Sequence, residues 1–261
     1  MIPTTFDIFI MDVAADNQQK TLYKSNLGKC FNCTSLFYFQ TNVERECKMA
    51  TKANKKEHIR NQIIAASRIY SNNLAGKVFL YVIGEEYFEV VFQTNRFMHL
   101  TGVNSTLNAQ NFYDKAKDSI LTTNQFYFDD NHPYASAKKK LSCLIMLPNL
   151  TNSLVCVIKD MQTVTLTYKI GITNIDFTIG LTENTDFSGN KINDWFLPRT
   201  LRVKDKAIDN NSQVEFVDFI FSKDASREKY TEVTFMDKDK PIPSSIKSML
   251  SPRIKDSLNQ Q

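Results

Sequence analysis

The clearest periodic pattern of apolar and polar positions predicts an amphipathic helix over residues 55–74. Apolar or small side chains recur there at steps of three and four residues, which places them on one face of a helix. These residues are Ile59, Ile63, Ile64, Ala66, Ser67 and Tyr70. Basic residues lie mostly on the opposite face, and Asn72, Asn73 and Gly76 are suited to ending the helix.

Two shorter helices are predicted downstream. The first runs from about Asn108 to Ile120, and Asn108 is a good N-cap residue because its side chain can accept a hydrogen bond from a free backbone N–H. The second covers residues 135–147, carries three consecutive lysines from Lys138 to Lys140, and ends before Pro148, which cannot continue a helix.

Short apolar runs predict strands around these helices. Two lie near the N-terminus, at Thr5–Val13 and Ser35–Thr41, and two more, at Val78–Ile83 and Tyr87–Gln93, flank a short turn and predict a hairpin. The strands predicted in the second half are Leu154–Lys159, Thr163–Ile172, Asp176–Thr182, Trp195–Val203, Glu215–Ser222 and Tyr230–Met236. Because no helices separate these later strands, we expect them to form an antiparallel sheet.

The pattern as a whole indicates an α+β fold, with early helices packed on a late, twisted antiparallel sheet. Residues 1–55 are expected to be a β-rich extension, which is either a separate module or extra strands of the same sheet. Residues 56–238 are expected to form the main α+β domain, and residues 239–261 a tail that contains a short helix.

Composition narrows the functional classes only a little. Apolar residues make up 42% of the 261 residues, which allows a sizeable core. With seven glycines and neither a GxGxxG nor a GxxxxGK[ST] motif, the chain has no sequence signal for a glycine-rich phosphate loop. The net charge of +4 permits an anionic partner such as nucleic acid without requiring one.

The sequence also suggests a compartment. It lacks an apolar run of about 18 residues, so we expect no transmembrane helix and no membrane partner. The first residues carry no basic region typical of a secretory signal, and the five cysteines are spaced irregularly, unlike a disulfide framework. A cytoplasmic location is therefore expected.

The first candidate for chemistry is His99, with Arg96 three residues before it and Gly102 three residues after it. Histidine can both take up and release a proton near neutral pH, because its ordinary pKa is about 6.5. Taken alone, the segment fits a histidine that simply bonds to backbone at a strand end at least as well as it fits a catalytic one.

The second candidate is the face of the late sheet. The predicted strands there carry Lys169 beside Tyr168, and Arg199 and Thr200 beside Pro198. Because proline cannot donate a ladder hydrogen bond, its strand must lie at an edge, begin at the proline or bulge there. For Thr200 an ordinary β-forming role is favoured, and a solvated strand face explains Arg199 about as well as a functional role.

Together these residues match what a metal-independent ribonuclease requires. Such an enzyme needs a group that moves protons and cations that stabilise the extra negative charge on phosphate in the transition state. The predicted catalytic residues are His99, Arg199, Thr200 and Lys169. The predicted nucleic-acid-binding residues are Arg96, Tyr168, Arg202 and Lys115.

A family resemblance extends over about residues 56–236. It is carried by the succession helix, hairpin, Phe-x-His-Leu-x-Gly, Asn-Phe-Tyr-Asp-Lys, Ile-Asp-Phe-Thr-Ile-Gly-Leu and Trp-Phe-Leu-Pro-Arg-Thr. The matching positions are Phe92, Phe97, His99, Leu100, Gly102, Phe112, Tyr113, Lys115, Asp176, Gly180, Pro198, Arg199 and Thr200. This arrangement resembles the phage-borne branch of the Barnase–EndoU–ColicinE5/D–RelE-like nucleases. The resemblance implies a helix-plus-antiparallel-sheet fold and an RNA-cleaving toxin or effector of phage or mobile-element origin.

RNA is accordingly the expected partner, together with an antitoxin, an immunity protein or another protein. A second hypothesis is a non-enzymatic phage or defence-related inhibitor that uses the same sheet to bind a protein or nucleic acid. The sequence leaves open which of the two holds, and so whether the protein is an enzyme at all.

No cofactor is expected, but one possible metal site must be considered. Cys30 and Cys33 form a CxxC pair, and Cys47 and His58 follow, so four potential zinc ligands are present. A single CxxC with loosely spaced partners is a weak signal, and buried apolar cysteines are the more common explanation.

Overall fold

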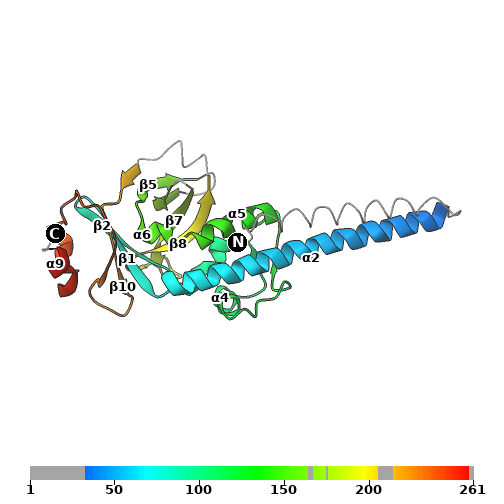
Figure 1. Ribbon diagram of the computed structural model, residues 1–261, viewed down its shortest axis with the longest axis horizontal. Helices are drawn as coiled ribbons and strands as arrows, with labels where there is room; N and C mark the ends of the chain where they lie inside the picture. The colour runs from blue at the N-terminus through cyan, green and yellow to red at the C-terminus, as the bar shows by residue number, and fades with distance from the viewer. Residues whose placement is uncertain (1–32, 164–166, 175, 205–213, 259–261) are drawn as a thin grey trace, which may run out of the picture. The chain divides into compact units, whose positions relative to one another are not determined.

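The computed structural model describes residues 33–163, 167–174, 176–204 and 214–258 (Figure 1). The chain divides into two compact units, Met1–Asn54 and Lys55–Gln261. The strand expected at Thr5–Val13 lies outside the described residues.

The first described element is a single long helix, α2 (Cys33–Asn73). The strand predicted at Ser35–Thr41 is therefore wrong. That segment has a run of β-forming aromatic and aliphatic residues, but such short apolar runs occur in helices as well as strands. The helix predicted over residues 55–74 is confirmed, and its buried side chains include Ile59, Ile63, Ala66 and Tyr70.

The predicted hairpin and the two shorter helices are also confirmed. Strands β1 (Lys77–Ile83) and β2 (Glu86–Val91) pair in antiparallel fashion. The short helices η1 (Thr94–Arg96) and α3 (Phe97–Thr101) follow, and then α4 (Ala109–Lys117), where Asn108 accepts a hydrogen bond from the Asn111 N–H. The remaining elements of this half are β3 (Asn104–Ser105), β4 (Phe126–Tyr127), α5 (Tyr134–Ile145) and α6 (Asn149–Asn152).

Within the described residues, a nine-stranded sheet has the order β11-β10-β1-β2-β8-β7-β6-β5-β9. Its later strands are β5 (Cys156–Gln162), β6 (Thr167–Thr173), β7 (Phe177–Thr185), β8 (Lys191–Val203), β9 (Val214–Phe216), β10 (Phe219–Asp224) and β11 (Glu232–Met236). The single strand predicted at Glu215–Ser222 is thus two strands. β9 pairs with β5 at one edge, whereas β10 pairs with β1, so the chain changes partners between them.

One pairing in the sheet departs from the antiparallel prediction. β2 runs parallel to β8, and their ladder contains only the pairs Glu89–Trp195 and Val90–Phe196. Beyond Phe196, β8 still pairs with β7, but its other side is open to the short helices, and η1, α3 and α5 all contact it. This opening places helical side chains against the second half of β8.

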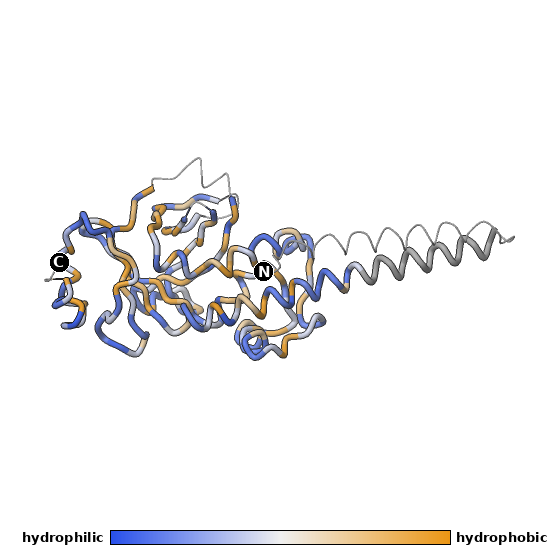
Figure 2. Tube along the Cα trace, viewed as in Figure 1, coloured by the Kyte–Doolittle hydropathy of each residue, from blue (hydrophilic) through white to orange (hydrophobic). Residues whose placement is uncertain are grey.

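Two large apolar clusters pack on the sheet, one on each face. The larger packs α2, α3, α4 and α5 against the sheet and is rich in aromatic rings, among them Tyr70, Phe97 and Phe112. The smaller lies under the C-terminal helices α8 (Ser244–Lys247) and α9 (Pro252–Leu258). Figure 2 shows the apolar positions concentrated along the strands, and Figure 1 shows α9 beside the β1–β10 end of the sheet.

The fold is therefore α+β with a mostly antiparallel sheet, as the sequence pattern predicted. None of the helices in the described ranges is long and apolar enough to cross a membrane.

Candidate functional site

His99 lies on α3, a helix that its neighbours hold firmly. Phe97 and Leu100 are fully buried in the larger apolar cluster, which fixes the helix against the sheet. Gly102 ends α3 with φ 76°, a left-handed conformation that glycine adopts without a steric penalty. His99 itself remains accessible to solvent, so a substrate could reach its ring.

Two guanidinium groups, Arg96 from η1 and Arg199 from β8, lie close to His99. Partial burial of the ring and the positive charges of Arg199 and Arg96 lower the pKa of His99 below its ordinary value of 6.5. The imidazole is therefore neutral at pH 7 and available to accept a proton. The predicted trio Arg96, His99 and Arg199 is brought together, although its members come from segments a hundred residues apart in sequence.

Arg96 is held unusually for a charged side chain. Its Nε is buried and has no hydrogen-bond partner among the described residues. Burial and the nearby Arg199 charge lower the pKa of Arg96, while the neighbouring Tyr70 ring hydroxyl raises it. No carboxylate contributes to the pKa of either Arg96 or His99 in the described part of the chain. Such a cluster favours an anion, because an anion would relieve the repulsion among its cations.

A β-bulge directs Arg199 toward this cluster. Along the β7–β8 ladder, Gly180 pairs with Thr200 but Leu181 pairs with Pro198, so Arg199 is the extra residue. A bulge turns its extra residue out of the regular alternation. Of the three options that Pro198 allowed, the structure has the bulge. β8 lies inside the sheet, so the edge position is wrong.

Two of the predicted residues, Tyr168 and Thr200, lie beside Gly180. Tyr168 is buried, with 8% of its surface exposed, in a small cluster with Ile158 and Met161, so its ring is not offered for stacking on a base. Thr200 is half-buried beside Gly180, and a Cβ at Gly180 would lie 2.8 Å from the Thr200 methyl carbon. The prediction that Tyr168 contacts nucleic acid is therefore not supported by its position.

The two predicted lysines, Lys169 and Lys115, lie on β6 and α4. Lys169 Nζ donates a hydrogen bond to Glu183 Oε1 at 2.7 Å, and this bond lowers the pKa of the Glu183 carboxyl group. Lys169 therefore already has a carboxylate partner, and its position gives no support to the predicted role as a phosphate clamp. Lys115 lies on α4, a helix that contacts both η1 and α3, and its side chain is half-buried.

The structure also places Lys140 near the site, a residue that was not among the site residues predicted from the sequence. Lys140 lies on α5 near Arg202 of β8, and burial together with the Arg202 charge lowers the pKa of Lys140. Three consecutive lysines on a predicted helix were visible in the sequence, but nothing local showed which one would face β8. The close approach of Lys140 to Gly102 was likewise invisible before the fold was known.

The possible zinc ligands do not converge in the described part of the chain. Cys30 lies outside the described residues, and Cys33 and Cys47 both belong to α2. Fourteen residues of helix separate these two positions by about 21 Å along its axis, which is far too long for two ligands of one ion. The four-residue set therefore does not fit a single tetrahedral site.

Comparison with known proteins bears on the same region. A family model described as phage-Barnase-EndoU-ColicinE5/D-RelE like nuclease 4 (PBECR4) matches residues 62–239, which is more than half of the chain and includes His99, Arg199 and Lys140. No curated protein and no solved structure gives a significant match. The matched region contains the whole cationic cluster, and we conclude that the chain belongs to this family of phage-associated nuclease-like proteins.

Proposed function

We propose that the protein is a metal-independent endoribonuclease that acts as a toxin or effector of phage or mobile-element origin. The observation that carries this proposal is the solvent-accessible His99 ring with the guanidinium groups of Arg199 and Arg96 close by, whose charges lower the pKa of the imidazole. A nuclease that uses no metal needs a proton acceptor next to fixed positive charge, and this cluster supplies both. Membership of a nuclease-like family supports a nucleic-acid substrate.

The chemistry follows from the three side chains. The neutral His99 imidazole takes the proton from a ribose 2′-hydroxyl, and the 2′-oxygen forms a bond to the adjacent phosphorus. The bond from phosphorus to the 5′-oxygen breaks, and the imidazolium, which lies beside the same phosphate, returns the proton to that oxygen. Arg96 and Arg199 stabilise the additional negative charge on the phosphate during the transfer. The products are a 2′,3′-cyclic phosphate and a free 5′-hydroxyl.

The direct test is to incubate the purified protein with total RNA in the presence of EDTA. We expect cleavage with 2′,3′-cyclic phosphate ends, and a loss of about 10²–10⁴-fold for His99→Ala, which is the usual contribution of a general acid–base group. The matched control is His132→Ala, since His132 lies on a loop and its Nδ1 is hydrogen-bonded to Asp129 Oδ1. Cleavage that requires a metal, or that survives in His99→Ala, would overturn the proposal.

A second candidate function, a non-enzymatic inhibitor, is favoured by a different surface. Val214 and Phe216 lie two positions apart on the edge strand β9, and 51% and 63% of their surfaces are exposed. Exposed apolar side chains on a strand edge suit a protein partner, which could be the target of an inhibitor or the antitoxin of a toxin. Intact RNA with both the original protein and His99→Ala, together with capture of a protein that Phe216→Ser no longer binds, would favour this function.

A further inference from the structure

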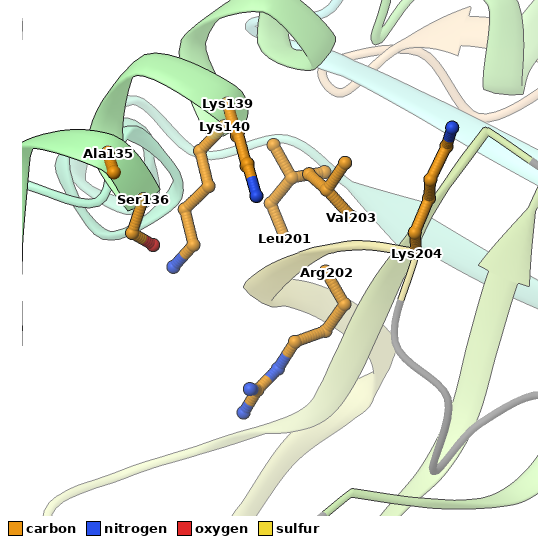
Figure 3. Close-up of a pocket in the computed structure, with 8 residues that line it drawn as sticks. All are labelled: Ala135, Ser136, Lys139, Lys140, Leu201, Arg202, Val203 and Lys204. Atoms are coloured by element: carbon orange, nitrogen blue, oxygen red, sulfur yellow. The ribbon is translucent and has the colours of Figure 1, made fainter.

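A cationic cavity lies beside the His99 cluster. It has a volume of about 400 Å³ and is formed between the first turns of α5 and the end of β8 (Figure 3). Its lining residues are Ala135, Ser136, Lys139, Lys140, Leu201, Arg202, Val203 and Lys204. Figure 3 shows lysine side chains reaching out from α5 and Arg202 reaching out from β8 on the two sides of the cavity.

The charge of this cavity has one sign. Half of its lining residues are lysine or arginine, and none of the described residues that line it is acidic. The ammonium groups of Lys139, Lys140 and Lys204 form no ion pair with a carboxylate in the described ranges. Because these three ammonium groups repel one another, their arrangement is typical of a site that binds an anion.

The start of α5 adds to the positive potential. Ala135 and Ser136 belong to the first turn of this twelve-residue helix, and they line the cavity. The N-terminus of a helix carries partial positive charge from its aligned peptide dipoles, although the Ser136 N–H itself already donates to the Pro133 carbonyl oxygen. The Ser136 hydroxyl is a further hydrogen-bond donor at the same place. The cavity thus offers charge and neutral donors together, which is what a phosphate group requires.

The cavity also has a defined position relative to His99. Lys140 packs directly over Gly102, the residue that ends the helix of His99, because a Cβ at Gly102 would lie only 2.7 Å from Lys140 Cδ. Along β8, Arg202 follows Arg199 by three residues, a distance of about 10 Å in a strand. A stacked nucleic-acid strand carries one phosphate per about 3.4 Å of its axis, so a phosphate in the cavity and a phosphate at Arg199 would belong to different nucleotides of one strand.

We propose that this cavity binds a backbone phosphate of single-stranded RNA that lies several nucleotides from the scissile phosphate at His99. This inference rests on the proposed function and specifies its substrate, which is an extended strand and not a dinucleotide. The cavity contributes binding, and the His99 cluster performs the chemistry. Its contribution is therefore seen only with substrates long enough to reach both.

The test uses Lys140→Met, which removes the charge but keeps an unbranched apolar side chain of similar length over Gly102. The matched control is Lys138→Met, because Lys138 is exposed on the same helix and does not line the cavity. Binding of a fluorescent RNA decanucleotide is measured by anisotropy in the His99→Ala background, where the RNA stays intact. We expect Lys140→Met to weaken binding about tenfold and to reduce the slope of log affinity against log salt by about 0.7.

Cleavage is measured separately in the protein that retains His99. For Lys140→Met we expect a raised KM for the decanucleotide and unchanged kinetics for a dinucleotide. Equal effects of the Lys138 and Lys140 substitutions, or no effect of Lys140→Met on binding, would overturn the inference even where the protein cleaves RNA. A different outcome is that the protein cleaves no RNA, yet Lys140→Met still weakens decanucleotide binding. The phosphate-binding inference would then stand, and only the proposed ribonuclease function would be overturned.

Discussion

At the scale of single residues, the environment of His99 determines the direction in which it titrates. Both charges that influence its ring, on Arg96 and Arg199, are positive, and partial burial acts in the same direction. All three effects favour the neutral imidazole. This differs from a histidine paired with a carboxylate, whose proton is held more tightly.

The first prediction concerns the pH dependence of the site. Because the pKa of His99 is lowered, the neutral form persists below pH 6.5, and the cleavage rate should rise with pH to a midpoint under that value. Arg199→Gln removes one positive charge and should move the midpoint upward, toward 6.5. The His99 ring resonance in an NMR titration and the pH–rate profile both measure this midpoint.

The sign of the linked effect on stability can be worked out in the same way. The unfolded chain binds a proton at His99 more readily than the folded protein does. Stability therefore increases as pH rises through the folded pKa up to the ordinary value of 6.5, and it is lost on acidification.

If Arg199→Gln left the midpoint of the His99 titration unchanged, the charge of Arg199 would not act on the ring.

At the scale of elements, Gly102 is the residue at which α3, the helix of His99, packs against Lys140 of α5. Its φ of 76° requires a residue that tolerates the left-handed region, and its missing side chain leaves room for the stem of Lys140. The same residue thus ends α3 and sets how closely α5 approaches it.

The second prediction separates these two roles of Gly102. Gly102→Ala should cost about 1–2 kcal/mol from the backbone conformation alone, plus the cost of displacing Lys140. Gly76→Ala is the control, since Gly76 also has a φ of 76° but no atom within 4 Å of the added carbon. Urea unfolding should show a larger loss for Gly102→Ala, and equal losses would mean that the packing of Lys140 on this residue contributes nothing.

The elements also show what the sequence could predict. Helix periodicity, the N-cap at Asn108 and the hairpin are local signals, and the structure confirms them. The strand predicted at Ser35–Thr41 is wrong because such a short apolar run fits a helix or a strand equally well. The order of the strands in the sheet was not predictable from the sequence either, because the parallel pairing of β2 with β8 joins residues more than a hundred positions apart.

For the candidate site too, local features were predictable from the sequence and long-range contacts were not. The chemical types of Arg96, His99 and Arg199 were readable from the sequence, but their meeting depends on the bulge at Arg199 and on the open side of β8. Lys169 had the right charge, yet its ammonium group forms a salt bridge with Glu183 on the neighbouring strand β7. A charge pattern alone does not show which cations remain without a counter-ion.

At the scale of the whole molecule, the C-terminal segment is part of the core and not a loose tail. Ile246, Leu250 and Ile254 are buried against the face of the sheet that α2 does not cover. The family match ends at residue 239, so this cover lies outside the matched region. The unit formed by Lys55–Gln261 therefore depends on residues beyond the shared domain.

The third prediction tests that dependence. Ile254→Ala should lower the free energy of unfolding by about 3 kcal/mol, as is usual when a large aliphatic side chain is removed from a core. The control is Ile192→Ala, which removes the same atoms from a side chain that is 61% exposed and should change stability by less than about 0.5 kcal/mol. Comparable losses in urea unfolding would show that the C-terminal helices are not packed on the sheet.

The hundred residues between His99 and Arg199 have a consequence for a cell that synthesises this protein. At about 5–20 residues per second, the ribosome needs on the order of 5–20 s to pass from one residue to the other. Until β8 has emerged and paired with β7, the growing chain holds the histidine but not the bulged arginine that faces it. A polypeptide released before β8 is made would therefore lack the assembled cluster, and under the proposed function it would not cleave RNA.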